Sequence, residues 1–181
     1  PKREPKPALD ELRKVSFPAQ PFTKEYTIVS EIPKGEVEIY WPTTDALDIK
    51  RTRRLTLLSE VFNDRLRVKV REEIGGTYSP NAGSSPSEAY PGYGFMTASI
   101  DVDPPKAGQI ADVVTAIADD LAKNGVTDDE LERARQPIMT GIRESLRNNG
   151  YWLGSVLLRA QEKPEVLDWA RNRVADFGGI T

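Results

Sequence analysis

The fold is decided by residues 55–80, LTLLSEVFNDRLRVKVREEIGGTYSP, because a helical pattern runs through this stretch and then stops at two glycines. Apolar residues recur at helical spacing along one stripe, which is typical of an amphipathic helix packed on a core. Gly75 and Gly76 provide the left-handed backbone that commonly ends a helix. The sequence therefore predicts a long helix from Asp48 to Ile74, followed by a tight turn into a strand. The stripe consists of Leu55, Leu58, Phe62, Leu66 and Val70.

Arg71 and Tyr78 stand on either side of this turn, seven residues apart. Both side chains donate hydrogen bonds at neutral pH, since arginine stays charged and the pKa of tyrosine is about 10. Two converging donors suit a peptide carbonyl, or the oxyanion that forms when the carbonyl is attacked. Each residue also has a structural explanation, because the helix dipole favours a cation in the last turn and a tyrosine ring packs well in a sheet. The residues alone leave both interpretations open.

The chain of 181 residues contains no histidine and no cysteine. Zinc sites are overwhelmingly built from these two residue types, so we expect no zinc site within this chain. The serines between residues 79 and 87 lie near the donor pair, but a serine nucleophile needs an activating base, which the sequence does not offer. Asp101 and Asp103 lie two apart at a predicted strand end without a third ligand nearby in sequence, so we interpret them as surface carboxylates.

The composition is that of a water-soluble domain with a net charge of −3 and a pI of about 5.2. This acidic balance argues against nucleic acid or an anionic membrane as a partner. The apolar runs are only a few residues long, which excludes insertion into a membrane. Basic residues spread around the predicted helix, and we expect them to form a solvated surface, with a chamber wall or a domain contact as the alternative. They are Lys50, Arg51, Arg53, Arg54, Arg65, Arg67 and Lys69.

Four strands and four further helical patterns flank or follow the decisive stretch. The predicted strands are Thr23–Ser30, Gly35–Trp41, Thr77–Ala89 and Tyr93–Val102, with Ser84-Ser85-Pro86 interrupting the third. Antiparallel strands followed by helices predict an α+β fold, with an antiparallel or mixed sheet and helices packed on one face. The later helical signals are the apolar spacing from Ile110 to Leu121, the capping box Thr127–Glu130, the segment Tyr151–Gln161 and the segment Pro164–Ala175, with a kink expected at Pro137.

Two further segments bear on domain organisation and on binding. Residues 1–22 are rich in proline and mixed charge, and we predict an extended linker that wraps the domain formed by residues 23–181. Three aromatic residues, Tyr90, Tyr93 and Phe95, are interleaved with glycines. We interpret them as packed rings of a strand, with close approach by another chain as the alternative.

Residues 55–80 resemble the second half of the pitrilysin and insulin-degrading-enzyme family of zinc peptidases. The match is an arginine and a tyrosine seven apart, with Gly-Gly between them and Ser-Pro after them. In that family the first half carries the zinc motif H-x-x-E-H, and the second half lacks it but supplies an arginine and a tyrosine that reach substrate. The resemblance covers nearly all of residues 23–181 and implies the mitochondrial-processing-peptidase-like half-domain fold, incomplete at its C-terminus, with the last helix and strand missing.

The resemblance implies that this chain is the substrate-binding, non-zinc half of a zinc endopeptidase. Tyr78 would donate to the scissile carbonyl or its oxyanion, Arg71 would hold a neighbouring carbonyl of the substrate, and Gly75 and Gly76 would aim both side chains. Zinc, the activated water and a glutamate base would come from a zinc-bearing half-domain, in the same chain or in a separate subunit. The substrate would be a peptide or an unfolded polypeptide, and this chain alone would be inactive.

The resemblance leaves two other functions open. One is a non-catalytic scaffold or processing-subunit domain of the same fold, and the other is a stand-alone peptide-binding module. The compartment is also open, with a periplasmic or otherwise exported location favoured because many bacterial relatives are exported.

Overall fold

The computed structural model describes residues 9–26, 29, 31, 34–74 and 79–181, and for residues 71–74 the backbone only. Within this part, three strands form one antiparallel sheet in the order β1-β3-β2. Their bounds are β1 Gly35–Thr43, β2 Asn81–Pro86 and β3 Gly94–Val102. The register places Trp41 opposite Met96 and Ala82 opposite Ala98, so the apolar positions of all three strands share one face.

The described residues also contain five α-helices and one π-helical segment. They are α1 Ile49–Ile74, α2 Ala107–Asn124, α3 Asp128–Ser145, the π-helical η3 Tyr151–Leu157, α4 Leu158–Ala160 and α5 Val166–Gly178. Short 3-10 turns lie at η1 Glu11–Arg13 and η2 Pro104–Lys106. The α+β prediction is thus confirmed with an antiparallel sheet. The capping box at Thr127 starts α3 as predicted, and α3 continues past Pro137.

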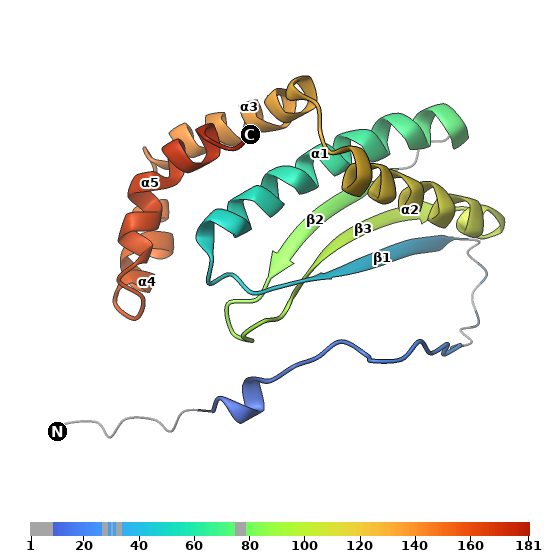
Figure 1. Ribbon diagram of the computed structural model, residues 1–181, viewed down its shortest axis with the longest axis horizontal. Coiled ribbons are helices and arrows are strands. Elements are labelled where there is room, and N and C mark those ends of the chain that lie inside the picture. The colour runs from blue at the N-terminus through green and yellow to red at the C-terminus, as the bar shows by residue number, and fades with distance from the viewer. Residues whose placement is uncertain (1–8, 27–28, 30, 32–33, 75–78) are drawn as a thin grey trace.

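The helices α1 and α2 lie on the same side of the sheet (Figure 1), and the main core is formed between them and β3. The predicted stripe of α1 is confirmed, because three of its members are fully buried and Leu55 and Leu58 pack against them. The buried residues of this core are Phe62, Leu66, Val70, Met96, Ala98, Ile100, Val102, Ile110, Val114 and Ile117.

Two strand predictions are wrong in part. Residues 23–26 and 29 are not in a strand, because they are exposed and no neighbouring strand pairs with them. Ser84, Ser85 and Pro86 do not interrupt a strand but form the last half of β2. Proline is tolerated there because β2 has a sheet partner on only one side among the described strands, so a missing N–H on the other side breaks no ladder.

Two arginines of α1, Arg53 and Arg65, join the later helices to it, which corrects the prediction of a solvated surface for these two residues. Other basic residues of the predicted surface are exposed as predicted, namely Lys50, Arg54, Arg67 and Lys69. Arg53 is only 5% exposed, bonds to the carboxylate of Asp176 in α5 and donates to the carbonyl of Trp169 at 2.5 Å. Arg65 bonds Glu130 in α3. Both are structural because α3 and α5 pack beside α1 (Figure 1) and bring carboxylates onto the helix. No local pattern in the sequence could show this.

Candidate functional site

The sheet has a second face, turned away from α1 and α2, which we call the open face. It consists of Glu36, Glu38 and Tyr40 from β1, Phe95, Thr97, Ser99 and Asp101 from β3, and Asn81, Gly83 and Ser85 from β2. All ten residues are exposed or half-buried. The alternating, core-facing positions are buried on β3 but only half-buried on β1 and β2. The side chains from β2 are small, so the backbone of that strand is accessible from this face.

Helix α1 and strand β2 flank the predicted Arg71–Tyr78 turn in the chain. Helix α1 ends at Ile74 and β2 begins at Asn81, which lies opposite Ser99 on β3. Arg71 is in the last turn of α1, while its side chain and residues 75–78, including Gly75, Gly76 and Tyr78, lie outside the described residues. The convergence of the two donors therefore stays a prediction. The described surroundings supply an edge strand with small side chains, which is a suitable support for an extended polypeptide.

Tyr40 supplies a hydroxyl on the β1 side of the open face. Its Oη atom donates to Oε2 of Glu38 at 2.7 Å. This hydrogen bond, with the negative charges of Glu38 and Glu36, raises the pKa of Tyr40 above its ordinary value. The phenol is therefore a permanent donor in the physiological range. Tyr40 is not among the candidate site residues predicted from the sequence, although it alternates with the core-facing residues of β1 and so lies on the opposite face.

Aromatic rings form a continuous row from Tyr40 to the N-terminal segment. Tyr40 meets Phe95 edge-on at 5.4 Å between ring centroids, and Phe95 meets Tyr93 at 6.2 Å. Phe17 lies flat on Tyr93 at 4.8 Å, with 15° between the ring planes. The rings pack on one another as predicted, and a distant segment of the same chain lies against them, while close approach by another chain stays a prediction. Phe17 was missed because its partner lies 76 residues away along the chain.

Gly94 allows a second close approach at the same end of the sheet. A Cβ atom at Gly94 would lie 2.1 Å from the carbonyl oxygen of Thr44, so no larger residue fits without moving the backbone. Asp45 follows and accepts hydrogen bonds from the backbone N–H groups of Gly92 and Leu47. The hydrogen bond from Gly92 is the main cause of a lowered pKa of Asp45, and the bond from Leu47 adds to it. The loop after β1 is thus fixed to the β2–β3 turn that carries Tyr90 and Tyr93.

The carboxylates Asp101 and Asp103 do not come together as a ligand pair. Asp101 is exposed on the open face, whereas Asp103 lies beyond the strand and forms an ion pair with Lys106 at 3.6 Å. In the part of the chain that the structure describes, no three acidic, histidine or cysteine side chains are grouped closely enough to hold a metal ion. None of the described helices is both long and apolar enough to cross a lipid bilayer.

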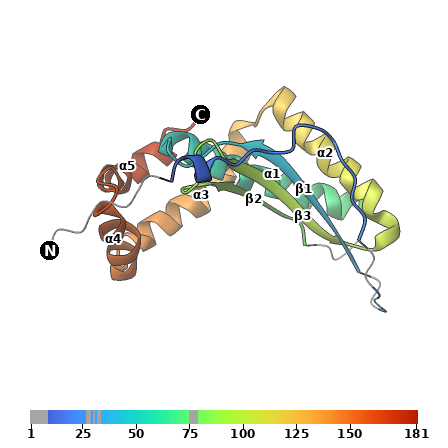
Figure 2. The ribbon, with the colours of Figure 1, turned by 90° about the horizontal axis from the view of Figure 1, so that it is seen from below.

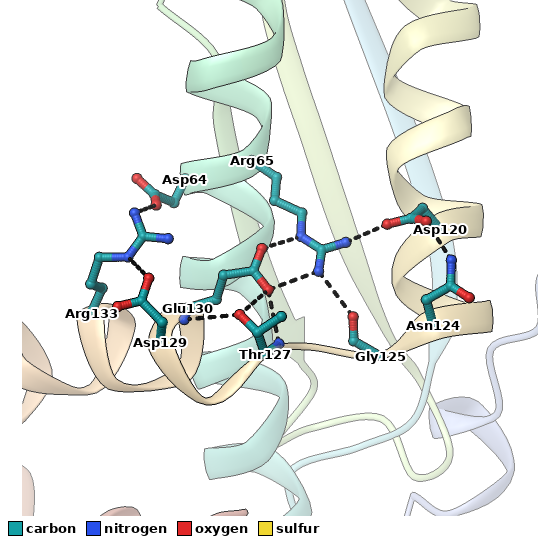
Figure 3. Close-up of polar contacts among 9 residues, drawn as sticks. All are labelled: Asp64, Arg65, Asp120, Asn124, Gly125, Thr127, Asp129, Glu130 and Arg133. Atoms are coloured by element: carbon teal, nitrogen blue, oxygen red, sulfur yellow. Dashed lines mark hydrogen bonds and ion pairs between the residues drawn. The ribbon is translucent and has the colours of Figure 1, made fainter.

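The largest described cavity, about 860 Å³, lies away from the open face, between α1, α2 and the start of α3. Figure 3 shows that Arg65 and Arg133 at its wall already hold carboxylates. Arg65 bonds both oxygens of Glu130, at 2.6 and 2.9 Å, and donates to Asp120 at 2.7 Å and to the carbonyl of Gly125 at 3.0 Å. With these donors engaged, the arginine joins three helices instead of offering a binding group.

Glu130 should make the fold sensitive to acid. Its bonds to Arg65 and to Thr127 lower its pKa from an ordinary 4.5 to about 2. A carboxylate with a lowered pKa stabilises the fold above pH 4.5, and this contribution is lost as the pH falls through about 2. We expect Glu130→Gln, which keeps the capping geometry, to lose about 2–3 kcal/mol of unfolding free energy at pH 7 and much less at pH 2.5.

Urea unfolding of both proteins at the two pH values measures this difference. The matched control is Glu132→Gln, because Glu132 lies in the same helix and pairs with Arg135, yet its side chain is half exposed. We expect little change for the control at either pH. An equal loss for Glu130→Gln at pH 7 and pH 2.5 would contradict the role of the charge.

A family model described as the peptidase M16 inactive domain matches residues 2–138. The chloroplastic stromal processing peptidase of Pisum sativum is 31% identical over 98 residues, covering 54% of this chain and 8% of that protein. The probable zinc protease PqqL of Haemophilus influenzae is 22% identical over 129 residues, covering 66% of this chain and 14% of the relative.

The fold also matches a solved structure, that of the periplasmic protease PqqL from Escherichia coli. The TM-score is 0.66 at 13% identity, and the match covers 84% of this chain and 17% of the solved one. The chain thus spans less than a fifth of the length of each of these proteins.

Proposed function

Because this chain belongs to the pitrilysin family as its peptidase M16 inactive domain, we propose that it is the substrate-binding half of a zinc-dependent endopeptidase. The match over residues 2–138 is the observation that carries the proposal. The absence of histidine and cysteine supports it, since a zinc-bearing half would need such ligands. Relatives named as a processing peptidase and a probable zinc protease agree with this class of reaction.

In this proposal the chain contributes donors and a binding surface, while the chemistry is supplied by a partner half. The partner holds zinc, whose role is to activate water and polarise the carbonyl under attack. Tyr78 donates a hydrogen bond to the oxyanion of the scissile bond, and Arg71 holds a neighbouring carbonyl oxygen of the substrate. Gly75 and Gly76 form the turn between them. The polypeptide then extends along β2 and the open face, where small side chains leave room for its backbone.

We expect the 181-residue chain alone to hydrolyse no peptide. The physical reason is that an oxyanion donor without a metal or a general base lacks the nucleophile. The measurement is cleavage of a quenched fluorescent peptide in the presence of zinc, by the chain alone and by a longer protein in which it is joined to its zinc-bearing half. Turnover should occur only in the longer protein and should stop on addition of a chelator.

Two results would contradict the proposal. Chelator-sensitive turnover by the chain alone would show that the nucleophile is generated here. A longer protein that binds peptide but never cleaves it, despite an intact zinc motif in its other half, would favour the scaffold function instead.

A further inference from the structure

The row of rings on the open face ends in a contact between two distant parts of the chain. Phe17 stacks on Tyr93, and Tyr90 and Phe95 meet the same tyrosine edge-on at 6.3 and 6.2 Å. Tyr93 is thus surrounded by rings from two elements and from the N-terminal segment. The side chain of Phe17 is half-buried, whereas most of its neighbours in sequence are exposed. An aromatic side chain of an extended segment therefore already occupies a place on this face.

A ring stack and a hydrogen bond join residues 13–17 to the region between β2 and β3 in the part of the chain that the structure describes. Besides the ring stack, Nε of Arg13 donates to the carbonyl oxygen of Ala89 at 2.6 Å. The flanking apolar side chains stay in solvent, with Leu12 77% and Phe22 72% exposed. The segment runs below the sheet in Figure 1 and along the strands in Figure 2, on the side away from α1 and α2. A segment fixed at two points by solvent-accessible contacts opens at low cost compared with global unfolding.

The chemistry of the segment indicates what else can bind there. Residues 17–22 read FPAQPF, so an aromatic residue is followed by prolines that favour an extended backbone with little entropy to lose. Aromatic-lined surfaces recognise extended, proline-containing chains of this kind. A substrate polypeptide presenting an aromatic side chain meets the same surface that Phe17 now covers.

We propose that Tyr93, flanked by Tyr90 and Phe95, is a subsite for an aromatic side chain of an extended polypeptide, and that residues 13–17 occupy it in cis as a strap. The inference deepens the proposed function, because it assigns a preference to the surface along which substrate would lie. Substrate binding then requires the strap to leave. A site that is covered nine-tenths of the time binds an external ligand about tenfold more weakly than the same site uncovered.

The test measures binding of a fluorescein-labelled peptide with the sequence of residues 11–22 to the full 181-residue chain, by fluorescence anisotropy. Phe17→Ala in the chain should raise the affinity about tenfold, because the strap loses its ring. Phe22→Ala is the matched control, since it removes an equal ring from the same segment without a contact to the subsite, and should leave the affinity unchanged. Adding Tyr93→Ala to Phe17→Ala should cancel the gain.

A second subsite variant, Phe17→Ala with Tyr93→Leu, keeps apolar volume but removes the stacking partner, and it should also lose the gain. Thermal unfolding of each variant shows that the fold is intact. Failure of Phe17→Ala to strengthen binding, or a double variant that binds as tightly as Phe17→Ala alone, would overturn the proposal. Failure of the proposed function is distinguishable from failure of this inference. If the proposed function is wrong, the longer protein does not cleave the peptide, whereas the peptide affinities of the 181-residue variants still change as described.

Discussion

Replacing Tyr78 by phenylalanine in a protein that joins this chain to its zinc-bearing half is expected to lower kcat about 10²–10³-fold, with KM little changed. The substitution removes one hydroxyl and keeps the ring, so packing is preserved. The loss has this size because a donor aimed at the oxyanion acts mainly in the transition state, and deleting one typically costs this factor. An interaction made only in the transition state lowers kcat and kcat/KM alike.

Steady-state kinetics on a quenched fluorescent peptide give both constants. Tyr26→Phe is the matched control, because Tyr26 is 75% exposed and its ring is contacted by Lys24. The control should keep wild-type kinetics. A Tyr78→Phe enzyme with unchanged kcat would remove Tyr78 from the catalytic role, and an increase in KM alone would reassign it to ground-state binding of the substrate.

Asp176→Asn is expected to destabilise the fold by about 3–5 kcal/mol. Arg53 is buried in α1 and its charge is balanced by Asp176 in α5. Burial lowers the pKa of Arg53, while Asp176 opposes that effect. The guanidinium nevertheless stays protonated, since arginine loses its proton only at very high pH. Removal of the carboxylate charge leaves a buried cation without its counter-ion, and such losses cost about 3–5 kcal/mol.

Urea denaturation at pH 7 measures this loss. Asp168→Asn in the same helix is the matched control, because Asp168 pairs with Arg171 at 2.9 Å but its side chain is 68% exposed, and exposed pairs contribute at most about 1 kcal/mol. A double variant with Arg53→Met and Asp176→Leu should recover much of the stability, since no charge is then left buried. Equal stabilities for Asp176→Asn and Asp168→Asn would show that the Arg53 pair adds nothing.

The sequence predicted those parts of the fold that depend on local periodicity and on chain-breaking residues. The apolar stripe gave the long helix, the Thr127–Glu130 pair gave the start of α3, and alternation gave β1 with Val37, Ile39 and Trp41 toward the core. Local periodicity did not predict that β2 lies at the edge of the described sheet. Proline usually breaks a strand, and its tolerance at Pro86 follows only from the strand order.

In the candidate site, too, the features predicted from the sequence are those formed by residues close together in the chain. The Arg71–Tyr78 spacing is a property of consecutive residues, so the sequence could offer it as a hypothesis. The contact of Phe17 with Tyr93, the pairing of Arg53 with Asp176 and the attachment of Arg65 to Glu130 join residues far apart in the chain. Such contacts leave no periodic pattern in the sequence. The sequence also does not distinguish a charged side chain that is solvated from one that is paired with a distant carboxylate.

By itself, the amino-acid sequence determined the long helix α1, the strands β1 and β3, the start of α3 and the absence of histidine and cysteine as metal ligands, because these depend on neighbouring residues or on composition. Tertiary structure alone decided which arginines of α1 are buried, which face of the sheet stays open and which ring covers Tyr93. The physical reason is that burial and pairing are set by what the folded chain brings into contact, after the local preferences have been satisfied.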